Sequence, residues 1–167
     1  MIEFRRLTTE DEQAFMTYIQ SWNKDEELVP SAVDYDRYDT FEALIDALAF
    51  RESGKDWVKN TTLFLFVDDS IVGAGNIRHT LDEALLARGG HIGYGTGPAH
   101  RGKGYATDIL RRSLAFLRDI GVNRVLVTCD EDNFSSAQVI IKNGGVEDVS
   151  FTKENNEKVR RFWIDND

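Results

Sequence analysis

The sequence contains a single cysteine, Cys129, and only two prolines among its 167 residues. One cysteine cannot form a disulfide within the chain, so we expect a reducing, cytoplasmic environment. No apolar run approaches the roughly 20 residues that a membrane-spanning helix needs. No apolar segment follows the charged N-terminus, so no signal peptide is predicted. These scarcities argue against a disulfide scaffold and against a membrane protein.

Basic residues are outnumbered, since 20 lysines and arginines stand against 29 aspartates and glutamates, for a net charge of -9. Nucleic-acid binders usually carry a basic face, so this balance argues against that class. The charge is also unevenly spread. Residues 8–42 are strongly acidic, whereas residues 97–124 carry six basic and two acidic side chains. The basic segment suits an anionic cofactor, and the acidic segment either attracts a cationic acceptor or forms solvated helix faces.

Hydrophobic periodicity predicts an α/β chain that forms one domain over residues 1–167. Strands are expected at 2–7, 62–67, 71–78, 91–96, 124–129, 146–153 and 158–164. Helices are expected after residue 9, from residue 39, over 106–120 and after residue 133. In the third strand, Gly73 and Gly75 leave room for another element to approach closely. No repeat or long linker divides the chain.

The segment 101–107, with the sequence Arg-Gly-Lys-Gly-Tyr-Ala-Thr, lies directly before the most regular predicted helix. A helix N-terminus presents unpaired backbone N–H groups and the positive end of the helix dipole, and phosphate oxygens satisfy both. Small residues keep the backbone of this segment accessible, namely Gly102, Gly104 and Ala106. Basic side chains add positive charge, namely Arg101 and Lys103. The sequence therefore predicts an anion-binding turn.

Two other phosphate-binding patterns each fail at one position. A Walker A loop that began at Gly97 would need serine or threonine at the place of Gly104, to hold magnesium. A dinucleotide-binding fingerprint would need a third glycine where Thr107 stands. Such a fingerprint would also come early in a βαβ fold, whereas this segment follows four predicted strands. Both nucleotide-binding classes are therefore disfavoured.

The pattern Arg/Gln-x-x-Gly-x-Gly/Ala is matched by Arg101, Gly104 and Ala106, and it resembles the coenzyme A motif of the GNAT superfamily of N-acetyltransferases. A predicted strand precedes the motif at the spacing seen in that family. A second family signature, Asn-x-x-Ala/Ser before a short helix and a glycine, resembles residues 133–145. The order of the predicted elements also matches. The resemblance thus covers nearly the whole chain and is most specific over residues 91–145.

The resemblance implies both a fold and a co-substrate. The fold is a mostly antiparallel, mixed sheet of six to seven strands, splayed between the fourth and fifth strands, with about four helices on its faces. The gap between those strands holds the pantetheine arm of acetyl-CoA. Carried over position by position, the implied coenzyme A-binding residues are Gly95, Thr96, Arg101, Gly102, Lys103, Gly104, Tyr105, Ala106, Thr107, Asn133 and Ser136. Asn133 also stands where a helix cap is expected. No cluster of His, Cys and carboxylates has metal-ligand spacing, so no metal is predicted.

The sequence departs from the family at the groups that move protons. Many relatives carry a tyrosine, thought to protonate the leaving thiolate, at the position where Ile140 stands, and isoleucine cannot donate a proton. The remaining catalytic candidates are Tyr94, on the fourth strand, and His79, which is either a loop histidine or a group on the acceptor side. We expect His91 and Cys129 to be structural, because the one faces away from the cleft and the other lies in a buried strand.

The function implied is transfer of an acetyl group from acetyl-CoA to a primary amine by direct attack in a ternary complex. The acceptor is a small amine, an amino acid or a peptide N-terminus. The alternative is a coenzyme A-binding sensor or regulatory module that has lost catalysis, which the missing tyrosine favours. The final hairpin leaves an edge strand free to pair with a second copy, so a homodimer is a further expectation.

Overall fold

Two antiparallel sheets form the framework of the computed structural model, which describes residues 1–167. The larger sheet has the strand order β1-β2-β3-β4, and the smaller sheet has the order β5-β7-β6. The strands are β1 (Ile2–Arg5), β2 (Asn60–Val67), β3 (Ser70–Arg78), β4 (Ile92–Thr96), β5 (Arg124–Asp130), β6 (Val146–Thr152) and β7 (Lys158–Asp165). The α-helices are α1 (Glu12–Gln20), α2 (Phe41–Arg51), α3 (Tyr105–Asp119) and α4 (Phe134–Lys142). A π-helical turn, η4 (Leu85–Gly89), joins β3 to β4. None of the helices combines the length and the apolar character that crossing a membrane requires.

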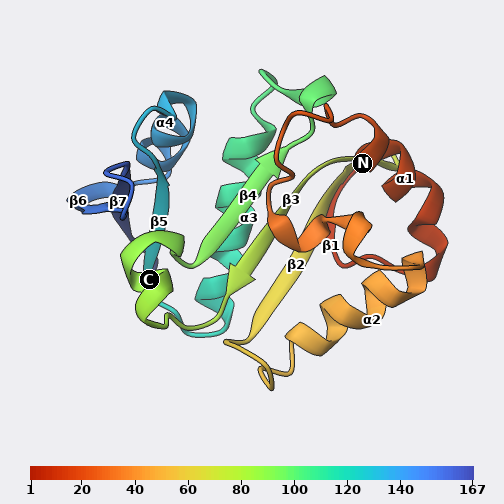
Figure 1. Ribbon diagram of the computed structural model, residues 1–167, viewed down its shortest axis with the longest axis horizontal. Coiled ribbons are helices and arrows are strands. Elements are labelled where there is room, and N and C mark those ends of the chain that lie inside the picture. Colours follow the sequence, from red (N-terminus) through yellow and green to blue (C-terminus); the bar gives the residue numbers. More distant parts are fainter.

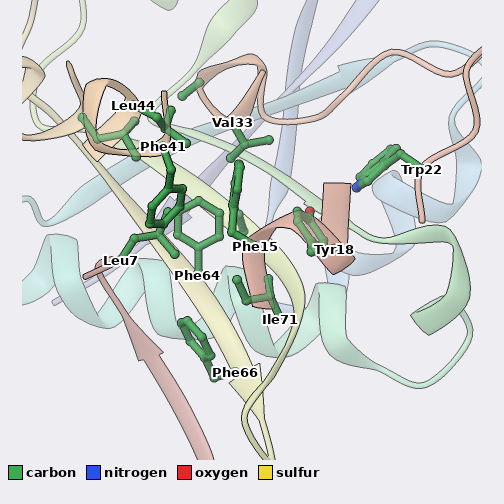
Figure 2. Close-up of a cluster of buried hydrophobic side chains, with 13 residues drawn as sticks. Leu7, Phe15, Tyr18, Trp22, Val33, Phe41, Leu44, Phe64, Phe66 and Ile71 are labelled. Carbon is green, nitrogen blue, oxygen red and sulfur yellow. The ribbon is translucent and has the colours of Figure 1, made fainter. Parts of the chain in front are cut away.

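Helices cover both faces of the larger sheet, with α1 and α2 on one face and α3 on the other (Figure 1). The first face is held by an aromatic cluster in which Phe15 of α1 lies 5.4 Å from Phe41 and 6.0 Å from Phe64, measured between ring centroids. Figure 2 shows this cluster, with Tyr18 and Trp22 at one end of it. We call this face of the larger sheet the front face, and the face covered by α3 the back face.

The helix α3 approaches β3 closely because β3 carries glycine where the helix crosses it. A Cβ added to Gly73 would lie 2.6 Å from Cδ1 of Ile109, and one added to Gly75 would lie 3.0 Å from Oγ of Ser113. Side chains at these positions would push α3 away from the sheet. The expectation that these glycines admit another element is therefore confirmed.

The two sheets meet at the start of β4 and diverge from there. The backbone N–H of His91 donates to the carbonyl of Leu126 on β5 at 2.7 Å. The N–H of Leu126 in turn donates to Nδ1 of the His91 imidazole at 2.9 Å, so a side chain completes the pairing where the backbone ladder stops. Beyond this point β4 and β5 belong to separate sheets. The predicted opening between the fourth and fifth strands is thus confirmed, and the expectation that His91 is structural agrees with its position.

Candidate active site

The turn before α3 presents a row of free backbone donors. No backbone N–H group from Arg101 to Thr107 donates to a backbone carbonyl, and no side chain caps the helix. Gly102 and Gly104 adopt left-handed φ angles of 77° and 83°, and a Cβ added to either would meet nothing within 4 Å. Only glycine adopts that conformation readily, and the open space leaves the donors accessible. The predicted residues 101–107 therefore come together as a turn suited to an anion.

The side chain of Arg101 is engaged by the protein itself. Its Nη2 donates to Oε2 of Glu26 at 2.6 Å, and its guanidinium lies 5.4 Å from the centre of the Trp22 ring. The hydrogen bond from Arg101 lowers the pKa of the Glu26 carboxyl below its usual value. Arg101 thus links the turn to the acidic segment between α1 and α2. We call residues 21–40 the acidic loop. Lys103, in the same turn, is exposed and makes no hydrogen bond to another side chain.

Two predicted residues meet between β4 and α4, and a third caps that helix. The hydroxyl of Tyr94, from β4, lies 2.9 Å from the hydroxyl of Ser136, in the first turn of α4. Oδ1 of Asn133 caps α4 by accepting the backbone N–H of Ser136 at 3.1 Å. Burial raises the pKa of Tyr94 to about 12, so its hydroxyl stays protonated at neutral pH. Ile140, at the position of the family tyrosine, is fully buried in the core.

In β4, the backbone N–H and C=O groups of alternate residues pair with β3, and those of the residues between them point to the gap. The N–H of Gly97 donates to Val72 of β3, so by alternation the backbone groups of Gly95 also face β3 and those of Tyr94 and Thr96 face the gap. The groups open to a pantetheine arm therefore belong to Tyr94 and Thr96, which corrects the expectation for Gly95. A Cβ on Gly95 would lie 2.3 Å from the carbonyl oxygen of Val29, so this glycine instead admits the acidic loop.

The polar side chains around the end of β4 include groups without partners. The Thr96 hydroxyl is buried and makes no hydrogen bond, and the same holds for the Tyr18 hydroxyl and the indole nitrogen of Trp22. Tyr18 packs against Gly97, since a Cβ there would lie 3.1 Å from the tyrosine ring. Figure 2 places Tyr18 and Trp22 next to each other at the edge of the front core. Unpartnered buried polar atoms are rare in folded proteins, so the Thr96 hydroxyl on β4 is a candidate to bind a ligand.

The structure does not bring His79 to Tyr94. Nε2 of His79 lies 2.9 Å from the hydroxyl of Thr61, and its ring packs 5.6 Å from Phe116 of α3. Tyr94 pairs with Gly75, which is four residues before His79 and thus about 13 Å away along the strand. Burial also lowers the pKa of His79, which keeps the ring neutral. This histidine belongs to the packing between β2 and α3.

One charged residue beside β4 was not among the candidates that the sequence suggested. Arg78 ends β3, and its guanidinium lies against β4, where a Cβ on Gly93 would be 3.1 Å from Nη2. Nη1 donates to the carbonyl of Gly89 at 3.2 Å, whereas Nε is buried without a partner. Burial alone lowers the pKa of Arg78 to about 10. The sequence did hold a signal for this position. Arg78 lies an even number of residues from the buried Ala74, so both side chains point to the same face of the strand, where a charge is unusual.

These features fit the two ends of an acyl-coenzyme A molecule. The donors of residues 101–107 suit a pyrophosphate, and the free backbone of Tyr94 and Thr96 suits the amides of a pantetheine arm. Both features lie along β4 and at its C-terminal end. The open space above Gly102 and Gly104 leaves room for the phosphates.

Comparison with known proteins identifies relatives by family and by fold. The N-acetyltransferase of Staphylococcus aureus Mu50 is 16% identical, with a TM-score of 0.65 over 100% of this chain and 99% of that chain. The yncA protein of Salmonella typhimurium, solved with its cofactor acetyl-CoA, is 14% identical, with a TM-score of 0.61 over 99% and 94% of the two chains. Mutant forms of the spermidine/spermine N-acetyltransferase SpeG of Vibrio cholerae are 14% identical, with a TM-score of 0.66 over 99% and 94%.

At these identities the structural matches establish the fold, and no curated protein sequence matches the chain. The family follows from a different comparison. The model of the acetyltransferase (GNAT) domain matches residues 2–146, which is most of the chain and includes the turn before α3 and the capped start of α4. The chain therefore belongs to the GNAT acetyltransferase family.

Proposed function

We propose that this chain is an acetyl-CoA-dependent N-acetyltransferase that acts on a primary amine, with residues 1–167 forming its one domain. The observation that carries the proposal is the row of free N–H groups over residues 101–107 at the mouth of the gap between β4 and β5. An anion-binding turn beside an open strand edge suits a ligand with a pyrophosphate at one end and amides along its arm. The acetyl-CoA held by the yncA structure supports this choice of co-substrate.

Different residues hold different parts of the co-substrate. The backbone of Arg101 to Thr107 holds the pyrophosphate, and Lys103 adds a positive charge close by. Thr96 and Tyr94 offer backbone groups to the pantetheine arm, and the unpartnered Thr96 hydroxyl is a further donor. Asn133 positions Ser136 at the far side of the gap. The acidic loop, held to the turn by Arg101, covers the acceptor side.

When bound, acetyl-CoA supplies an acyl carbon that an amine attacks and a thiolate that leaves. A free amine needs only to be positioned and to lose a proton to water. The thiolate must take up a proton, and we propose that Tyr94 supplies it. Its pKa of about 12 keeps the phenol protonated until a base is nearby, and Ser136 fixes the direction of its hydroxyl at 2.9 Å. Tyr94 thus acts from β4 in place of the tyrosine that Ile140 replaces on α4.

Thiol release in the presence of acetyl-CoA and a library of primary amines tests the proposal. We expect turnover by the wild-type protein and a fall in kcat of about 100-fold in Tyr94→Phe, with coenzyme A affinity changed by less than about threefold. Ser53→Ala is the control, because it removes a hydroxyl that donates to the Phe50 carbonyl at the end of α2, outside the acidic loop and the turn. Tight coenzyme A binding without turnover across the library would favour the sensor instead. Turnover unchanged in Tyr94→Phe would remove Tyr94 from the mechanism and leave the activity standing.

A further inference from the structure

Arg78 is a partly buried arginine on the front face of the sheet, and no carboxylate pairs with it. Its pKa is lowered by burial alone, and no other charged side chain contributes to that shift. Its hydrogen bonds go only to the carbonyls of Gly89 and Gly90, both from Nη1, at 3.2 and 3.5 Å. Buried charges are normally paired, because the loss of hydration costs several kcal/mol when it is not offset. The imbalance at Arg78 therefore points to a negatively charged group that the chain itself does not supply.

The geometry of the guanidinium narrows the kind of anion. With Nη1 used by the carbonyls, the edge formed by Nε and Nη2 makes no hydrogen bond within the chain, and Nε is the buried, unpartnered atom. Two parallel N–H donors on one planar edge match the two oxygens of a carboxylate. Lysine would present a point charge without that fork. The free edge of Arg78 is thus suited to a bidentate carboxylate.

Arg78 lies on the same side of β4 as the acidic loop, which covers the acceptor side. Its guanidinium lies on Gly93, and two residues further along β4 the acidic loop lies on Gly95 through the Val29 carbonyl. Gly93 and Gly95 share the front face, because alternate residues of a strand point to the same side. Tyr94, between them, directs its side chain to the back face and to Ser136. An acceptor that reaches β4 from the front therefore passes Arg78.

The acidic loop and Arg78 carry opposite charges. The loop holds exposed carboxylates such as Asp25, Glu27, Asp36 and Asp39, which attract an ammonium group. Arg78, on β3, attracts a carboxylate. A molecule with an amine and a carboxylate close together would meet both.

We propose that Arg78 is a specificity-determining residue that binds the carboxylate of the acceptor, so that the acceptor is an amino acid with a free α-carboxylate. This inference rests on the proposed N-acetyltransferase function and names its substrate class. A peptide N-terminus or a polyamine lacks a carboxylate beside its amine and leaves Arg78 unpaired.

Matched acceptors test the proposal. Each standard amino acid with a primary amine is compared with its primary amide, and leucine also with 3-methylbutylamine, in the thiol-release assay. For the preferred side chain, we expect the free acid to exceed the amide at least tenfold in kcat/KM. In Arg78→Gln we expect kcat/KM for the acid to fall at least tenfold, mainly through KM, with the amide changed less than threefold. Arg78→Lys keeps the charge and should restore part of the loss.

The controls separate this role from a structural one. Arg111→Gln removes an arginine from the exposed face of α3 and should leave the preference for acids unchanged. Arg78→Gln and Arg78→Lys each keep a side-chain N–H donor, and circular dichroism with thermal melting checks their folding. A purely structural Arg78 would lower turnover of acid and amide alike. That result, or a wild-type protein that acetylates amides as well as acids, overturns the proposal while the proposed activity stands.

A direct binding measurement covers the case in which no acceptor turns over. N-acetyl amino acids and their amides are titrated by calorimetry into the protein loaded with coenzyme A. Binding of the acid but not the amide, lost in Arg78→Gln, supports the carboxylate site even if the proposed activity fails. Equal binding of acid and amide, or binding of neither, overturns it.

Discussion

The side chain of His91 accepts a hydrogen bond that a backbone carbonyl would accept in a continuous sheet. Its Nδ1 accepts the N–H of Leu126 at the point where the two sheets part, and only a neutral imidazole can accept there. Burial, with a smaller contribution from the Arg78 charge, lowers the pKa of His91 from 6.5 to about 4. The ring therefore has a structural role at this point of the fold. His91 joins β4 to β5 at the end of the gap where the two sheets meet.

The first prediction concerns the acid sensitivity that His91 confers. Its folded pKa of about 4 lies below the unfolded value of 6.5, so the unfolded chain binds the proton first. Stability is unaffected above pH 6.5 and falls as the pH drops from 6.5 to about 4, by roughly 3 kcal/mol in total. His91→Asn keeps an acceptor for Leu126 and cannot titrate, so we expect it to remove that part of the slope. Urea unfolding at several pH values measures the difference.

The comparison is between wild type and variant at each pH, because carboxylates also titrate over this range. His100→Asn, on the partly exposed turn before α3, serves as the control and should retain most of the wild-type slope. A His91→Asn protein with the same pH dependence as wild type would show that the pKa of His91 is the same in the folded and the unfolded chain.

The turn and the helix α3 act together as one element. Two left-handed glycines direct the backbone donors outward, and the helix that follows adds the positive end of its dipole. The side chain of Arg101 is turned to the acidic loop through Glu26. We infer that the backbone, more than the Arg101 side chain, binds the pyrophosphate.

The second prediction separates backbone strain from ligand binding in this element. Gly104→Ala should cost about 1 kcal/mol of stability, because φ is 83°, and should weaken acetyl-CoA binding at least tenfold by calorimetry. Gly121→Ala is the matched control at the other end of α3, with φ of 90° and open space around its Cβ. It should cost the same stability and leave the affinity unchanged. Equal affinity losses in both variants would mean that destabilisation alone explains the effect.

The third prediction concerns the link between the turn and the acidic loop. Arg101→Met removes the hydrogen bond to Glu26 and should raise hydrogen exchange across residues 24–38, since the loop loses its attachment to the turn. We expect acetyl-CoA affinity to fall only a few-fold, much less than in Gly104→Ala. Mass spectrometry of the exchanged peptides and calorimetry give the two readouts. A loss of affinity as large as that of Gly104→Ala would instead assign the Arg101 charge to the phosphates.

At the scale of the whole molecule, the two sheets share one hydrophobic cluster on the back face, while β4 and β5 diverge. Residues of the larger sheet, of α3 and of β5 and β7 pack in a single cluster, so the gap opens from a fixed base. Cys129 lies in this cluster with 7% of its surface exposed, and burial raises the pKa of its thiol. It is inert in the native state for both reasons. The exposed edge strand β6 is free on one side, and its pairing with a second copy stays a prediction.

The fourth prediction uses Cys129 to report on opening of the whole molecule. Alkylation by iodoacetamide, followed by mass spectrometry, should be slow in the native protein and complete in concentrated urea. Acetyl-CoA at about 100 times its Kd should slow native labelling up to 100-fold, because the ligand binds only the closed state. A labelling rate unaffected by acetyl-CoA would show that Cys129 becomes accessible through a local motion independent of the gap.

The sequence by itself determined the features that depend only on residues close together in the chain. The turn over 101–107, the glycine approach of α3 to β3 and the Asn133 cap follow from local conformation and strand or helix period, and element boundaries moved by only a few residues. Tertiary structure alone decided the contacts between distant segments. Arg101 meets Glu26 across 75 positions, and His91 meets Leu126 across 35. The same holds for the unbalanced charge of Arg78 on Gly93, because burial and pairing are properties of the packed chain and have no period in the sequence.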